Sequence, residues 1–250
     1  MGCQMIEQVE GIILNEKSYG ETSKIVNLLT KEYGIIGLMA KGAKQMKSPL
    51  RSVTGKLTYG KFYIIYKKDK LSLLTNADVL HYFKEIKRDI DRISYASFLL
   101  ELTEQVSRHT DSHALYDLLI SALIKIDEGF DPMVITNIIE LKYLDFLGVM
   151  PILDGCAICG NQTGIVTLSS SSGGYVCKHC LKQQEHIVDI KVIKLIRMFY
   201  YVDIAKIEKL EIKPLYKHQI NTFLDEYYDR YTGLYLKSKD FIKNLHKIIK

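Results

Sequence analysis

Two C-x-x-C pairs separated by 17 residues restrict how the middle of this chain can fold. Two pairs at this separation can bring four thiolates to the corners of a tetrahedron, which is the geometry of a closed structural zinc site. Four glycines between the pairs permit the tight turns that such a site needs. The predicted ligands of one Zn²⁺ ion are Cys156, Cys159, Cys177 and Cys180.

Four protein ligands leave no coordination position for water or a substrate, so this site is expected to stabilise a fold and not to catalyse a reaction. The spacing therefore disfavours a zinc hydrolase. Iron can also be held by four cysteines, and the sequence leaves the choice between zinc and iron open. His179 lies between two of the cysteines and is expected to be exposed, because four thiols already complete the ligand set.

The composition indicates a globular protein of a reducing compartment. Hydrophobic residues make up 47% of the 250 residues, which excludes wholesale disorder. No apolar run approaches the ~20 residues of a membrane span, and Glu7 and Glu10 stand where a signal peptide carries lysines. Four of the five cysteines belong to the two pairs, which favours a reducing environment. We therefore expect a cytoplasmic protein without a membrane partner, in which Cys3 is a bystander thiol.

Short strands separated by turns are predicted over the first 80 residues. In segment 57–67, Phe62 and Ile64 alternate with Tyr63 and Ile65, which is typical of a strand with two different faces. Five such strands in about 70 residues predict a small barrel or sandwich. The predicted strands are 11–14, 24–30, 35–40, 57–67 and 71–75.

After this region the apolar residues recur at helical spacing. Asp131 followed by Pro132 predicts an N-cap and a first-turn proline for a helix that ends near Gly148. Further apolar stripes follow Val192 and Pro214. The predicted fold class is α+β. The predicted domains are a barrel over 1–80, an all-helical domain over 81–150 and 186–250, and a four-cysteine zinc ribbon inserted at 151–185.

Charge is distributed unevenly along the chain, whose net charge is +5. Residues 1–80 hold twelve Lys and Arg against seven Asp and Glu, and residues 191–250 hold thirteen against seven. Residues 81–150 have the opposite balance, seven against twelve. This asymmetry is expected of a chain with one surface for a polyanion and another for a protein partner.

The window 33–68 contains eight basic residues, no acidic residue and several aromatic ones. Lysines neutralise phosphates and aromatic rings stack on bases, so the combination favours binding of single-stranded nucleic acid. Gly42 and Pro49 predict a mobile loop in this window, and the alternative is a solvated strand face with core tyrosines. The predicted contacts are Lys41, Lys44, Lys47, Arg51 and Lys56 for phosphates, and Tyr59 and Phe62 for bases.

Sequence motifs of common catalytic sites are missing. The chain has no GxxxxGK[ST] loop, no HExxH and no GxSxG. His109 and His113 are four residues apart, but no cluster of carboxylates or cysteines accompanies them. We therefore expect neither an enzymatic activity nor a small-molecule substrate.

Several segments together resemble a known protein family. Tyr19–Val26 (YGETSKIV), Leu29–Gly34 (LTKEYG) and Ala40–Ser48 (AKGAKQMKS) are similar to the opening of the bacterial recombination mediator family RecO. Gly173–Cys180 (GGYVCKHC) is similar to the zinc-binding end of that family. The resemblance covers essentially the whole chain, although Gln45 stands where the family pattern has a basic residue.

The resemblance implies an N-terminal OB-fold barrel, a helical domain and an inserted zinc ribbon. It implies binding of single-stranded and double-stranded DNA, annealing of complementary strands, and two protein partners. These are RecR and the acidic C-terminal tail of the single-stranded DNA-binding protein SSB, which together help to place RecA on gapped DNA. The expected function is a non-enzymatic mediator of DNA repair and homologous recombination at the nucleoid.

An SSB tail is acidic with a hydrophobic end, so it needs an apolar groove rimmed by lysine or arginine, and the helices after Lys191 can supply one. The residues alone leave a second function open. A zinc-ribbon adaptor in transcription or translation, whose barrel binds RNA or only proteins, has the same basic and aromatic composition.

Overall fold

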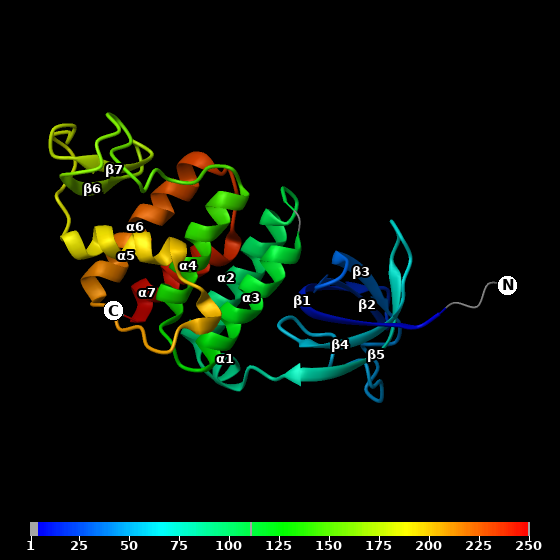
Figure 1. The fold of residues 1–250 in the computed structure, drawn as a ribbon. Helices are drawn as coiled ribbons and strands as arrows, with labels where there is room; N and C mark the ends of the chain where they lie inside the picture. Colours follow the sequence, from blue (N-terminus) through cyan, green and yellow to red (C-terminus); the bar gives the residue numbers. More distant parts are fainter. Residues whose placement is uncertain (1–4, 111, 250) are drawn as a thin grey trace. The chain divides into compact units, whose positions relative to one another are not determined.

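The computed structural model describes residues 5–110 and 112–249, and its N-terminal part is a closed five-stranded barrel (Figure 1). The strands follow the order β1-β2-β3-β5-β4, in which β3 and β5 are parallel and the other neighbours are antiparallel. This OB-type barrel confirms the predicted α+β fold, and Cys3 lies outside the described residues. The strands are β1 (Glu7–Tyr19), β2 (Ser23–Thr30), β3 (Gly34–Ala40), β4 (Tyr59–Ile65) and β5 (Ser72–His81).

Side chains that alternate along the strands fill the barrel. Phe62 and Ile64 of β4 are fully buried, whereas Tyr63 between them is partly exposed, as the alternation of a strand requires. At Gly60 a Cβ atom would lie 2.3 Å from the backbone oxygen of Asp78, so the close approach of β4 and β5 requires glycine there. The core also includes Val9, Val26, Leu28, Leu38 and Leu74.

Strands β1 and β5 are longer than the apolar pattern predicts. The second half of β1 is polar, but it continues to pair with β2 as far as Tyr19, which faces Ser23. In the same way β5 continues to His81, which pairs with Tyr59. Hydrogen-bonded pairing therefore extends beyond the apolar core, and apolar alternation alone underestimates the length of these strands.

The chain divides into two compact units, and the first combines the barrel with helices from both parts of the sequence. We call this the barrel unit; it contains the described residues up to Asp127 and from Ser238 onward. Asp89 begins α2 as its N-cap, because its carboxylate accepts hydrogen bonds from the backbone N–H groups of Asp91 and Arg92. The helices of this unit are α1 (Lys84–Arg88), α2 (Ile90–Val106), α3 (Ser112–Asp127) and α7 (Lys237–Ile249).

The second unit, Glu128–Lys237, contains three α-helices and a small two-stranded sheet, and we call it the ribbon unit. Asp131 caps α4 and Pro132 occupies its first turn, as the sequence predicts. The hydroxyl of Tyr228 on α6 donates a hydrogen bond of 2.9 Å to the backbone oxygen of Glu140 on α4. The elements are α4 (Pro132–Phe146), β6 (Ile165–Ser169), β7 (Gly174–Cys177), α5 (Ile190–Tyr201), a 3₁₀ turn (Ile204–Lys206) and α6 (Pro214–Tyr231).

Within the described part of the chain, no helix has both the length and the hydrophobicity that crossing a membrane requires.

Candidate functional site

The four cysteines of the ribbon meet at one point. Two of them lie in the turn before β6, the third is the last residue of β7, and the fourth lies in the turn that follows. All four sulfur atoms lie within 4.8 Å of one another, and the sulfurs of Cys159 and Cys177 are 3.7 Å apart. Zinc–sulfur bonds of about 2.3 Å in a tetrahedron place the sulfurs about 3.8 Å apart. The cluster Cys156, Cys159, Cys177 and Cys180 therefore has the dimensions of a tetrahedral metal site.

The backbone around the cluster favours thiolates. Burial raises the pKa of the Cys156 thiol, but backbone N–H groups of Cys177, Cys159 and Ile158 point at its sulfur and together hold the pKa at about 6. The Cys180 thiol has a raised pKa, mainly because it shares a hydrogen bond with Cys159 close to the other sulfurs. The protein itself therefore stabilises the Cys156 thiolate, whereas a thiolate at Cys180 needs a cation beside it.

The segment that carries these cysteines has almost no apolar core of its own. Its buried cluster consists of Cys156, Val176 and Cys177, with Ile165 and Cys180 packed against it. Two of the four cysteines are thus also core residues. An ion bound by all four would contribute most of the stability of this segment. His179 is exposed and does not belong to the cluster, as predicted.

The basic loop, which we define as residues 41–58, connects β3 to β4. Consecutive tight turns run through it, because Gln45, Ser48 and Arg51 each donate a backbone N–H to the residue three positions earlier. Ala43 and Leu50 are buried in the barrel core. The loop predicted to be mobile is therefore a run of turns anchored at two points, and Gly42, with a φ of 69°, begins it.

Four of the predicted phosphate contacts share the outer surface of this loop. All four are exposed, and no described acidic side chain forms an ion pair with any of them. The Lys44 ammonium group donates to the backbone oxygen of Gly20 at 3.3 Å, which connects the loop to the β1–β2 turn. The four residues are Lys41, Lys44, Lys47 and Arg51. Their positive charge is therefore available to an external anion.

The other three predicted contacts have partners inside the barrel unit. Phe62 has 0% of its surface exposed, so it has no free face for a base, which corrects its predicted stacking role. The ring of Tyr59 packs near Phe83, and its hydroxyl is hydrogen-bonded to Glu10. Lys56 is exposed but donates to the backbone oxygen of Ser97 on α2 at 3.5 Å, and partial desolvation of its ammonium group lowers its pKa.

Helices α2 and α3 contact β1, β2 and β3, which the sequence did not indicate. Glu104 of α2 accepts hydrogen bonds from Asn15 and Asn27 of the barrel, and Tyr116 of α3 donates to Glu10 at 2.9 Å. Strands 2 and 3 usually carry the ligand of an OB-fold. In this chain the carboxylate of Glu104 on α2 lies against β2 in that surface, which leaves the loops as the more favourable places for a polyanion.

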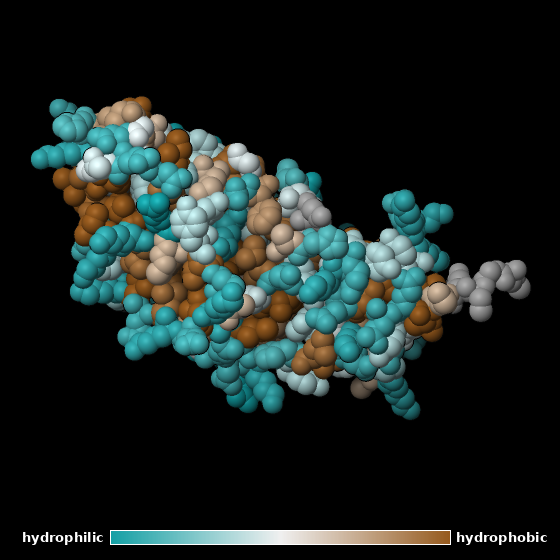
Figure 2. Space-filling view, viewed as in Figure 1, coloured by the Kyte–Doolittle hydropathy of each residue, from teal (hydrophilic) through white to brown (hydrophobic). Residues whose placement is uncertain are grey.

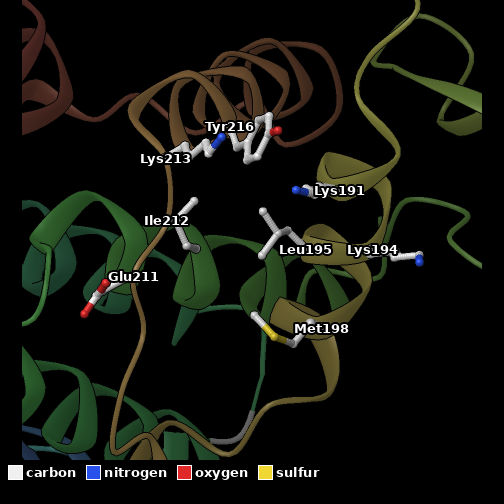
Figure 3. Close-up of a pocket in the computed structure, with 8 residues that line it drawn as sticks. All are labelled: Lys191, Lys194, Leu195, Met198, Glu211, Ile212, Lys213 and Tyr216. Carbon is white, nitrogen blue, oxygen red and sulfur yellow. The ribbon is translucent and has the colours of Figure 1, made fainter.

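A groove in the ribbon unit lies between α5 and the beginning of α6 (Figure 3). Its volume is about 490 Å³. Leu195 of α5 and Ile212, which lies before α6, point toward one another across it, and Met198 lies further along α5. The lining residues are Lys191, Lys194, Leu195, Met198, Glu211, Ile212, Lys213 and Tyr216. The groove thus has an apolar interior and a rim with three lysines against one glutamate.

The wall of this groove is held in place by Asp189, the N-cap of α5. Its carboxylate accepts a hydrogen bond from the backbone of Lys191 and another, at 2.6 Å, from the hydroxyl of Tyr216 on α6. These two hydrogen bonds lower the pKa of Asp189. The Lys213 ammonium group lies 6.0 Å from the centre of the Tyr216 ring. Figure 2 shows apolar surface on the part of the molecule that carries α5, bordered by hydrophilic side chains.

Comparison with known proteins agrees with this architecture. The sequence model of "Recombination protein O N terminal" matches residues 5–83, and that of "Recombination protein O C terminal" matches residues 87–240. The chain belongs to the recombination protein O (RecO) family. The predicted resemblance to this family is therefore confirmed.

Curated relatives support the family assignment over nearly the full length. "DNA repair protein RecO" of Listeria monocytogenes serotype 4b is 36% identical over 245 residues, which is 97% of this chain and 96% of the relative. Proteins of the same name from Halalkalibacterium halodurans and Bacillus cytotoxicus are 36% identical over 247 residues and 37% identical over 246 residues. Those matches cover 98% and 97% of this chain, and 97% and 99% of the relatives.

Proposed function

We propose that this chain is a non-enzymatic recombination mediator that binds single- and double-stranded DNA and anneals complementary strands. With RecR it would help to load RecA onto DNA coated with SSB. The observation that carries the proposal is the basic loop, where four exposed cations without a described acidic partner lie on a segment anchored in the barrel. Family membership and the curated name "DNA repair protein" support the same assignment.

Strand annealing is a consequence that follows from binding through phosphates. Lys41, Lys44, Lys47 and Arg51 would neutralise the charge of each strand without occupying the base edges. Two strands held in this way repel each other less, and their bases remain free to pair. A nucleotide cofactor is not needed for this step.

The test is annealing of two complementary oligonucleotides coated with SSB, without a nucleotide cofactor. We expect the wild-type chain to accelerate annealing and the triple variant Lys41→Ala, Lys44→Ala and Lys47→Ala to lose most of the acceleration. A control triple variant removes the same charge at the exposed positions Lys84, Lys206 and Lys209 and should keep it. Tight binding to RNA without any acceleration of DNA annealing would instead support the RNA-binding adaptor.

For the SSB tail we propose the groove between α5 and α6. A peptide that is acidic and ends in hydrophobic residues needs apolar contacts beside positive charge, and this groove offers both. Leu195 and Ile212 would contact the hydrophobic end, and Lys191 and Lys213 would pair with carboxylates. RecR is proposed as the second partner on the family resemblance alone.

Binding of a fluorescent SSB-tail peptide, measured by anisotropy, tests this assignment. Lys191→Ala with Lys213→Ala should weaken binding about tenfold or more, because each lysine pairs with a peptide carboxylate beside an apolar surface. Lys17→Ala with Lys84→Ala removes the same charge at exposed positions of the barrel unit, and this matched control should leave the affinity unchanged. Equal affinity of both double variants would remove the groove from the proposal.

For the four cysteines we propose one structural zinc ion. Cys156, Cys159, Cys177 and Cys180 would hold it through thiolates, and the closed set of four ligands gives it no catalytic position. Its contribution would be to fix a segment whose buried cluster is very small. Metal analysis of the purified protein distinguishes zinc from iron, and an iron-loaded protein is coloured.

A further inference from the structure

The β2–β3 turn and the β4–β5 loop form a second pocket at the surface of the barrel. Its volume is about 450 Å³, and no residue of the basic loop contributes to it. Residues of the β2–β3 turn and of β3 form one side, and residues 66–71 form the other. The lining residues are Tyr33, Ile35, Ile36, Gly37, Tyr66, Lys67, Asp69, Lys70 and Leu71. In an OB-fold, the β4–β5 loop is one of the places where oligonucleotides bind.

Two aromatic rings in this pocket are already stacked. The ring centres of Tyr33 and Tyr66 are 4.4 Å apart, and the ring planes differ by 16°. Tyr33 is 42% exposed, so the stack has surface that faces solvent. A nucleobase is flat and presents a π-face, so it can extend a stack of this kind irrespective of its sequence identity.

The Tyr33 ring is held in its position by local hydrogen bonds. Its hydroxyl donates to Glu7 at 2.8 Å, and its backbone N–H donates to the hydroxyl of Thr30 at 2.9 Å. The same Thr30 hydroxyl donates to the backbone oxygen of Gly34, whose φ of 65° closes the turn. A ring that is fixed before binding loses little conformational entropy when a base stacks on it.

Positive charge lies beside the rings. Lys67 and Lys70 line the pocket, Lys68 adjoins it, and no described acidic side chain forms an ion pair with any of the three. Asp69 is the one carboxylate in the lining, at the tip of the turn with a φ of 57°. The lining itself carries two positive charges against one negative charge, and the carboxylates of Glu7 and Glu32 lie on the Tyr33 side. The favourable place for a phosphate is therefore beside the lysines of segment 67–70.

We propose that this pocket binds one nucleotide of a single strand, with the base stacked on the Tyr33–Tyr66 pair and the phosphate near Lys67 and Lys70. The proposal rests on the DNA-binding function proposed above and adds a contact that discriminates between DNA forms. Bases in a duplex are paired and stacked on one another, so they cannot stack on the two tyrosine rings. The pocket would thus strengthen binding of single strands and not of duplexes.

The test compares the affinities of the wild-type chain and of Tyr33→Leu with Tyr66→Leu for oligo(dT) and for a duplex of equal length. We expect the double variant to bind oligo(dT) about five- to 150-fold more weakly, which corresponds to the loss of one stacked base. Its affinity for the duplex should stay within about twofold of wild type. Tyr63→Leu is the matched control, because Tyr63 also lies on the barrel and also donates its hydroxyl to a carboxylate, Asp78, at 2.9 Å.

The outcomes distinguish the nucleotide pocket from the broader proposal that the chain binds DNA. Unchanged affinity for oligo(dT), or an equal loss for oligo(dT) and the duplex, would overturn the nucleotide pocket while DNA binding itself stands. A wild-type chain that binds neither DNA would overturn both proposals. Tyr33→Phe keeps the fold and the ring, and it should retain single-strand affinity within about threefold. If it instead loses as much as the leucine variants, the hydroxyl and not the stack is responsible.

Discussion

Removal of three lysines from the basic loop should change the salt dependence of DNA binding by a defined amount. If Lys41, Lys44 and Lys47 each neutralise one phosphate, each contributes about −0.7 to the slope of log K against log salt for a single strand. The triple alanine variant should therefore have a slope smaller by about 2. Alanine is preferable to glutamate here, because it removes a charge without adding a repulsion.

The same relation gives the loss of affinity at each salt concentration. Counterion release no longer contributes at about 1 M salt, so the two proteins are compared from there. Loss of three contacts should then lower the binding constant about 500-fold at about 50 mM salt and about 30-fold at about 200 mM. For a duplex the slope should change by about 2.7, since each contact contributes about −0.9. The two proteins should thus differ most at low salt and converge at high salt.

Fluorescence anisotropy with labelled oligo(dT), measured at four or more salt concentrations, gives both quantities. The control triple variant at Lys84, Lys206 and Lys209 removes the same net charge from exposed positions outside the loop. It should retain the wild-type slope, because long-range charge effects are largely screened in this range of salt. A loop variant with the wild-type slope, or one that cannot be distinguished from the control, would refute the reasoning.

Three further predictions concern the metal, the barrel core and alkaline pH. Cys156→Ser with Cys180→Ser should abolish the one bound metal ion per chain and lower the melting temperature; metal analysis with unchanged content would contradict the four-cysteine site. Phe62→Ala should lower the free energy of unfolding by about 3–5 kcal/mol in urea titrations, because its ring is fully buried, whereas Phe62→Leu should cost far less and leave DNA affinity at the wild-type value. Burial and the hydrogen bond to Glu10 raise the pKa of Tyr59 to about 12, so the folded protein retains a proton that the unfolded chain releases near pH 10. That stability is present below about pH 10 and is lost as the pH rises toward 12; Tyr59→Phe should show a smaller decrease in unfolding free energy over this interval, and equal decreases would argue against it.

Local patterns in the sequence were sufficient to predict the barrel, the start of α4 and the cluster of four cysteines. The alternation around Phe62 and the Asp131-Pro132 pair each depend on neighbours within a few residues, and the structure follows both. The same alternation already places Phe62 on one face with Ile64. This pattern indicates a buried ring, and the prediction that Phe62 stacks on a base did not take it into account. A residue on the apolar face of a barrel strand is more often core than ligand contact.

Features that depend on distant segments could not be predicted in the same way. Lys56 belongs to an acid-free stretch of sequence, but its ammonium group donates to the backbone of α2. The contacts of α2 with β1 and of α3 with β2 join segments that are far apart, so no local sequence pattern indicates them. The groove needs α5 and the start of α6 together, so its lining residues could be identified only in the structure. The stacking of Tyr33 on Tyr66 likewise joins two turns that are far apart along the chain.

The barrel unit is built from two stretches of chain that the ribbon unit separates in the sequence. Ser238, at the start of α7, donates both its backbone N–H and its hydroxyl to Glu101 of α2, and Lys239 lies 5.7 Å from the centre of the Phe98 ring. Glu128–Lys237, in contrast, is one continuous stretch of the sequence. A truncation before Ser238 would therefore remove both hydrogen bonds that α7 donates to α2, far away along the sequence, while the groove and the cysteine cluster would keep all of their residues.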